Sequence, residues 1–62
     1  MRTKQYAATV ERGQRFWIIQ VPGVGTTQAR HLRELEAMTT DLIAVMEDID
    51  PATVEVTYRP AT

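Results

Sequence analysis

The sequence predicts a small α+β protein whose elements follow the order β-β-β-α-β, with one helix on one face of a mixed sheet. Three stretches indicate this class: a long amphipathic segment, Leu32–Ile49; a strongly β-prone run, Arg15–Val21; and an alternating run, Thr53–Arg59. The chain has 62 residues, so residues 1–62 form a single domain. A chain of this length buries only about 60% of its unfolded surface, so close packing or association with another chain must add stability.

The Leu32–Ile49 segment divides into two arcs when its residues are placed at about 100° per residue on a helical wheel. The apolar arc spans roughly 160°, although a helix lying on a sheet needs only about 100°. Its members are Val45, Met38, Ile49, Leu42, Leu35, Met46, Thr39, Leu32 and Ile43. We therefore expect apolar margins, namely Met38 and Val45, to remain available for another contact.

The helix should begin near His31 or Leu32 and stop at Asp50-Pro51, because a residue that precedes proline is disfavoured in the α region. His31 then stands at the N-cap, where a short oxygen acceptor is preferred over an imidazole.

The first hairpin should join a strand at Gln5–Glu11 to Arg15–Val21, with Arg12-Gly13 in the turn and Gly13 at positive φ. Arg15–Val21 is apolar on both faces, which is typical of a central strand.

Two registers of this hairpin remain open. A two-residue loop places Trp17 opposite Ala8, and a three-residue loop places Phe16 opposite Val10. A shift of one residue exchanges the two faces of the strand.

The remaining strands complete a meander and a crossover. Pro22-Gly23 ends the second strand, Val24–Ala29 fits a short edge strand, and Thr53–Arg59 is a half-buried strand closed by Pro60. The first three strands should pair antiparallel, and the last should lie parallel to the first and beside it. Since one helix covers one face, the apolar surplus of Arg15–Val21 should lie on the open face and favour a homodimer.

The composition argues against several kinds of site. The net charge is -1, so the chain as a whole lacks the basic footprint of a nucleic-acid-binding protein. There is no cysteine and only one histidine, so we expect no disulfide, no metal site and no cofactor. No apolar run reaches the roughly 18 residues of a membrane span, and no signal-peptide core is visible. A cytoplasmic protein without membrane contact is the expectation.

A set of short motifs, spread from Tyr6 to about Tyr58, resembles the HicB-like antitoxin family. They are Tyr6, Gly13, Trp17, Val21-Pro22, Gly23, Thr27-Gln28-Ala29, Leu32 and Glu34. A further match, similar to short actinobacterial members, comprises Leu35-Glu36-Ala37-Met38, Asp41 and Ile43-Ala44.

The resemblance implies a partial ribonuclease-H-like fold that binds and silences a HicA toxin, a small messenger-RNA-cleaving protein. It also implies that Glu34 belongs to a capping box at the start of the helix. Many members carry a second, DNA-binding domain; the sequence ends at Thr62 without one, so direct binding of nucleic acid is not expected. The alternatives are a solitary interaction or structural module without a toxin and, less favoured, a nucleic-acid-binding regulator.

Catalysis is not expected. A two-metal nuclease needs several carboxylates that converge from strand centres and a helix. Here Glu11 falls at a strand end, and the other candidates lie on the polar arc of the helix: Glu34, Glu36, Asp41, Glu47 and Asp48. These carboxylates indicate a solvated helix face, and the chain is predicted to work by binding.

The charges on the helix are placed against its dipole, and the acidic ones are predicted to bind a partner. Arg30 and Arg33 stand at the positive end, while acidic residues gather toward the negative end, where they suit a basic partner. Trp17 with Phe16 suits core or protein-interface packing better than base stacking, which needs a positively charged groove. The predicted partner-binding set is Trp17, Met38, Val45, Asp41, Glu47 and Asp48.

Overall fold

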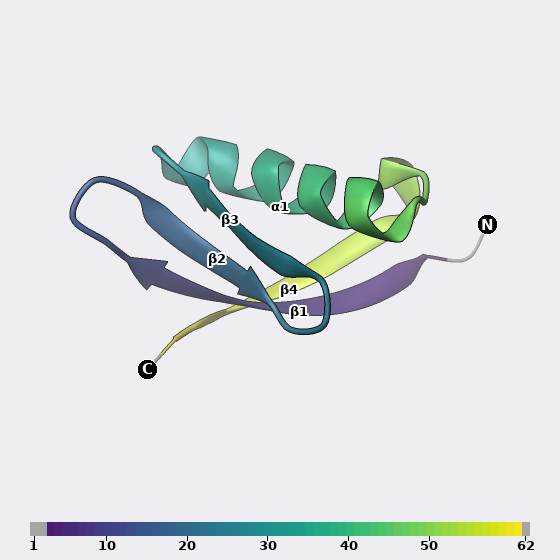
Figure 1. Ribbon diagram of the computed structural model, residues 1–62, viewed down its shortest axis with the longest axis horizontal. Coiled ribbons are helices and arrows are strands. Elements are labelled where there is room, and N and C mark those ends of the chain that lie inside the picture. Colours follow the sequence, from purple (N-terminus) through teal and green to yellow (C-terminus); the bar gives the residue numbers. More distant parts are fainter. Residues whose placement is uncertain (1–2, 62) are drawn as a thin grey trace.

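Helix α1 (Leu32–Glu47) lies across one face of a four-stranded mixed sheet (Figure 1). The structure is a computed structural model and describes residues 3–61. The strands are β1 (Lys4–Arg12), β2 (Trp17–Val21), β3 (Gly25–Ala29) and β4 (Val54–Pro60), and a 3-10 turn, Pro51–Thr53, precedes β4. The predicted α+β class and the order β-β-β-α-β are confirmed.

The sheet order is β3-β2-β1-β4. β1 with β2 and β2 with β3 form antiparallel pairs, so the predicted meander is confirmed. β4 runs parallel to β1, with Val56 beside Tyr6 and Tyr58 beside Ala8. The last strand therefore lies where the sequence predicts it, and β3 and β4 form the two sheet edges.

The register of the β1–β2 hairpin differs from both predicted alternatives. Arg12 pairs with Trp17 and Val10 with Ile19, which leaves a four-residue loop, 13–16. Gly13 has no positive φ; its N–H donates to the carbonyl of Phe16 at 2.8 Å, and a Cβ on Gly13 would lie 2.9 Å from that oxygen. Glycine is needed at this position because the backbone passes close by, and the expected reason was wrong.

The core lies between the sheet and the helix. Ala8, Ile19, Val21 and Ala29 of the sheet meet Leu35 and Ile43 of α1, and all six are buried. Thr39 is fully buried among them, as its place on the apolar arc predicts, and its hydroxyl donates to the carbonyl of Leu35 at 2.7 Å.

The open face of the sheet is mostly polar, which contradicts the expected apolar surplus. The register directs Trp17, Ile19 and Val21 to the helix side and leaves Ile18 as the only large apolar side chain of β2 on the other side. Exposed residues on that side are Gln5, Ala7, Glu11, Gln20, Thr26, Gln28, Glu55, Thr57 and Arg59. The expected ground for a dimer through this face is therefore lost.

The start of α1 lacks a side-chain cap. His31 is the N-cap residue, in extended conformation, and its imidazole makes no capping hydrogen bond. The Glu34 carboxylate accepts from the N–H of Arg30 at 3.1 Å, not from the N–H of the N-cap residue. The predicted start is confirmed, but the capping box that the resemblance implies is displaced by one residue.

The helix ends earlier than Asp50-Pro51, at Glu47. Asp48 takes the left-handed conformation, with φ 55°, and the N–H of Ile49 donates to the carbonyl of Ala44 at 3.1 Å. This is the bond of a Schellman ending, a motif that usually places glycine at the left-handed position. The chain then turns through Asp50, whose carboxylate accepts from the N–H of Ala52 at 2.9 Å.

Candidate protein-interaction surface

Four apolar residues lie along the side of α1 that faces the β3 edge, and we call them the apolar flank: Met38, Leu42, Val45 and Met46. Their spacing of four, three and one residues keeps them on one side of a helix. Val45 is 69% exposed, Met46 58% and Met38 39%. Leu42 is half-buried and packs against the core. The expected exposure of Met38 and Val45 is confirmed, and their role in binding stays a prediction.

Met46 was missed as an exposed residue because its wheel angle points toward the sheet. Helix α1 has 16 residues and β3 has five. At 1.5 Å per helical residue and 3.3 Å per strand residue, the helix is about 24 Å long and the strand only about 17 Å. The helix ends therefore extend past the short strands, and Leu32, 64% exposed at the other end, is uncovered too. A comparison of element lengths in the sequence would have found both residues.

Acidic residues border the apolar flank on its solvent side. Asp41 and Asp48 stand four residues before and three residues after Val45, and both are exposed. The last helical turn contains no basic residue. An apolar strip with an acidic border has the composition of a protein interface that suits a basic partner.

Glu47 does not share this side of the helix. Its carboxylate accepts a hydrogen bond from the phenol of Tyr6 in β1 at 3.3 Å, beneath the opposite side of the helix end. Desolvation, and then the charge and hydrogen bond of Glu47, raise the pKa of Tyr6 above its ordinary value of 10.0. Glu47 and Asp48, neighbours in the predicted set, thus lie on different sides of the helix end.

Trp17 is far from the acidic end. It lies at the start of β2, beside the hairpin loop, and packs half-buried against the core. The Arg12 guanidinium lies 5.6 Å from the centre of its ring, within the range of a cation–π contact. Figure 1 shows the hairpin loop at one end of the molecule and the C-terminus of α1 toward the other. The predicted site residues therefore lie in three places: Trp17 at the hairpin, Glu47 beside Tyr6 of β1, and the others along the apolar flank and its border.

Positive charge gathers at the Trp17 end. Arg12, Arg15 and Arg30 line one small recess together with Phe16 and Trp17. The net charge of -1 thus conceals a polarised distribution along a molecule 38 Å long, with arginines near the hairpin and carboxylates near the end of the helix.

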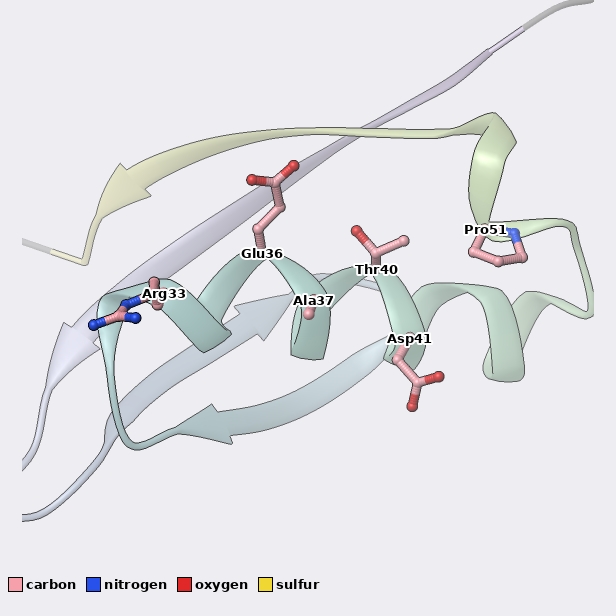
Figure 2. A pocket seen from close by; sticks show the side chains of 6 residues that line it. All are labelled: Arg33, Glu36, Ala37, Thr40, Asp41 and Pro51. Carbon is pink, nitrogen blue, oxygen red and sulfur yellow. The ribbon is translucent and has the colours of Figure 1, made fainter.

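A second recess lies on the outer side of α1 (Figure 2). Its lining residues are Arg33, Glu36, Ala37, Thr40, Asp41 and Pro51. Figure 2 shows Glu36 and Thr40 on the side nearer Pro51, with Asp41 directed away from them. The carboxylates diverge, and no nucleophile–base pair is formed. Within residues 3–61, no group of three or more His, Cys, Asp or Glu side chains could hold a metal ion.

Tyr58 contributes a buried phenol beneath the helix. Its oxygen has no hydrogen-bond partner within residues 3–61, and the hydroxyl of Thr39 donates to the carbonyl of Leu35. Burial is the main cause that raises the pKa of Tyr58; Thr39 opposes the rise, and the charge of Glu36 adds to it. The phenol is enclosed by the fold and faces no open recess on the apolar flank.

Comparisons with known proteins return no match to a family model, to a curated protein or to a solved structure. In the part of the chain that the structure describes, no helix is long and apolar enough to cross a membrane.

Proposed function

We propose that this protein is a binding module of the antitoxin type, which occludes a small, basic, RNA-cleaving toxin of the HicA kind by protein–protein contact. The observation that carries the proposal is the apolar flank, because Val45 and Met46 are more than half exposed beside Asp41 and Asp48. The choice of partner rests on the motif resemblance to HicB-like antitoxins.

Physical chemistry favours this surface as an interface. Exposed methionine and valine side chains gain free energy when another surface removes them from water. The bordering carboxylates steer a basic partner toward the flank and contribute more to the association rate than to affinity. The surface has no catalytic constellation, so binding is the activity that it can support.

The test is co-expression with a toxin of this kind, encoded by the reading frame next to the gene. The wild-type protein should restore growth of cells that are arrested by the toxin, and the purified pair should form a complex. Val45→Lys should weaken that complex by at least tenfold, because it places a cation in the apolar strip and against the basic partner.

Thr40→Lys is the matched control, since Thr40 points to the side of the same helix away from Asp41 and gains the same charge (Figure 2). It should leave the complex unchanged. Equal effects of the two variants, or absence of any complex with the adjacent toxin, would favour the solitary interaction module. A toxin-independent growth effect would argue against an antitoxin.

One observation favours the nucleic-acid-binding alternative: a small recess is lined by Arg12, Arg15 and Arg30. Trp17 borders this recess and is the only tryptophan, so its fluorescence would report an oligonucleotide bound there. Salt-dependent quenching by single-stranded RNA, lost in Arg15→Gln, would support this alternative. Unchanged fluorescence would exclude this recess as a nucleic-acid-binding site.

A further inference from the structure

We infer that two copies of this chain associate through the β3 edge, pairing the two β3 strands antiparallel about Thr27 and joining the two sheets into one. The partner is a second copy of this chain. The dimer uses Met38 and Leu42 of the apolar flank, so a toxin bound along the whole flank would compete with it.

The β3 edge lacks the features that usually protect an exposed strand. Proteins block unpaired edges with charged side chains, prolines or bulges. β4, the other edge, carries Glu55 and Arg59 and ends at Pro60. β3 reads Gly-Thr-Thr-Gln-Ala and contains no charge and no proline. Its length of five residues is the only restraint on pairing.

Met38 and Leu42 of the apolar flank lie beside this edge. A recess of about 580 Å³ beside β3 is lined by Thr26, Thr27 and Gln28, with Met38 from the helix and Ile18 from β2. Leu42 reaches the beginning of the strand, because a Cβ built on Gly25 would lie 3.5 Å from its Cδ1. The unprotected edge and the apolar side chains therefore form one continuous surface.

A second copy fits this surface better than an unrelated strand does. Antiparallel pairing about Thr27 sets Thr26 of each copy opposite Gln28 of the other, and Gly25 opposite Ala29, so no like charges meet. A two-fold axis perpendicular to the sheet keeps both helices on the same face, and the Met38 side of each helix then approaches that of its partner. The symmetric pair covers the edge together with Met38, whereas a single added strand would satisfy the edge alone.

The test uses sedimentation equilibrium of the purified chain from micromolar to millimolar concentration. The wild-type chain should be a dimer in the upper part of this range. The double variant T26K/Q28K should raise the dissociation constant about tenfold, because two symmetry-related pairs of like charges then face each other across the strands. Added salt should reverse much of that loss.

The matched variant T26K/Q28E instead places opposite charges at both cross-strand positions. It should dimerise at least as well as the wild-type chain, and salt should weaken it. In the single chain both variants change the same two exposed positions, so their melting temperatures at low concentration should be similar. Glu55→Lys at the β4 edge should leave the dimer unaffected.

A wild-type chain that stays monomeric at millimolar concentration overturns the inference. So does an equal dissociation constant for T26K/Q28K and T26K/Q28E, because the pairing about Thr27 requires them to differ.

Discussion

Replacement of Asp48 by glycine should stabilise the protein, because this residue ends α1 at φ 55°. An L-residue in the left-handed region brings its Cβ close to a backbone carbonyl, a strain of about 1–2 kcal/mol that aspartate partly relieves through its short polar side chain. The same carboxylate also stands at the negative end of the helix dipole, where an exposed charge costs about 0.3–1 kcal/mol.

Two gains and one loss set the size of the effect. Glycine removes the strain and the charge. Its greater conformational entropy in the unfolded chain offsets about 0.5–1 kcal/mol of that gain. A net stabilisation of about 1 kcal/mol remains, and for a domain of this size it raises the melting temperature by roughly 4–8 °C. The Schellman bond from Ile49 to Ala44 should persist, since it involves only backbone atoms.

Thermal unfolding followed by circular dichroism measures the effect, and two further variants separate its causes. Asp48→Asn keeps a side chain that tolerates the left-handed region and removes the charge, so it reports the electrostatic part. Asp48→Ala removes the charge and keeps the strain, so it should melt below Asp48→Gly. If Asp48→Gly melts at or below the wild-type temperature, the strain argument is refuted. If Asp48→Asn equals Asp48→Gly, charge alone explains the gain.

Two other predictions concern the helix start and the phenols. His31→Asp should melt higher, by the roughly 0.5–2 kcal/mol of a gained N-cap, because His31 makes no capping bond; lower melting of both His31→Asp and His31→Thr would reveal a contact of His31 elsewhere. The pKa values of Tyr6 and Tyr58 are raised above 10.0 in the folded state, so their contribution to stability is complete below pH 10.0 and falls as the pH rises through the folded values. In urea titrations from about pH 9 to about pH 11, Y6F/Y58F should therefore lose less stability than the wild-type chain, and parallel losses would contradict this.

The sequence predicted the elements well because each has its own local signal. The helix follows from a 3.6-residue periodicity, and β4 follows from alternation that ends at proline. The edge position of β3 and the place of β4 beside β1 followed from connection rules. These rules leave few possible arrangements for a chain with so few elements.

The hairpin register could not be predicted, because it depends on a contact between two backbone segments. The N–H of Gly13 donates to the carbonyl of Phe16, and this bond closes a four-residue loop that no side-chain pattern indicates. The two-residue alternative gave Trp17 its correct face, the one it shares with Ala8, but the two alternatives misplaced its partner on β1 by four and three residues. The separation of Glu47 from Asp48 escaped prediction because Glu47 accepts a hydrogen bond from Tyr6 of β1, a long-range contact that the helical pattern does not show.

The proposed interaction surface follows from a mismatch of lengths that is already present in the chain. Eight residues of the apolar arc lie on the 16-residue helix, more than strands of five residues can cover. A shorter run of apolar positions would have matched the length of these strands and left the end of the helix polar. The surplus falls beside β3, the uncharged edge, and away from β4, the edge that carries charge and proline. In a domain with so small a core, each apolar side chain left in water is a large fraction of the available stabilisation. Three of the four exposed large apolar side chains, all but Leu32, belong to the apolar flank next to an unprotected strand, and this indicates a surface that a second chain completes.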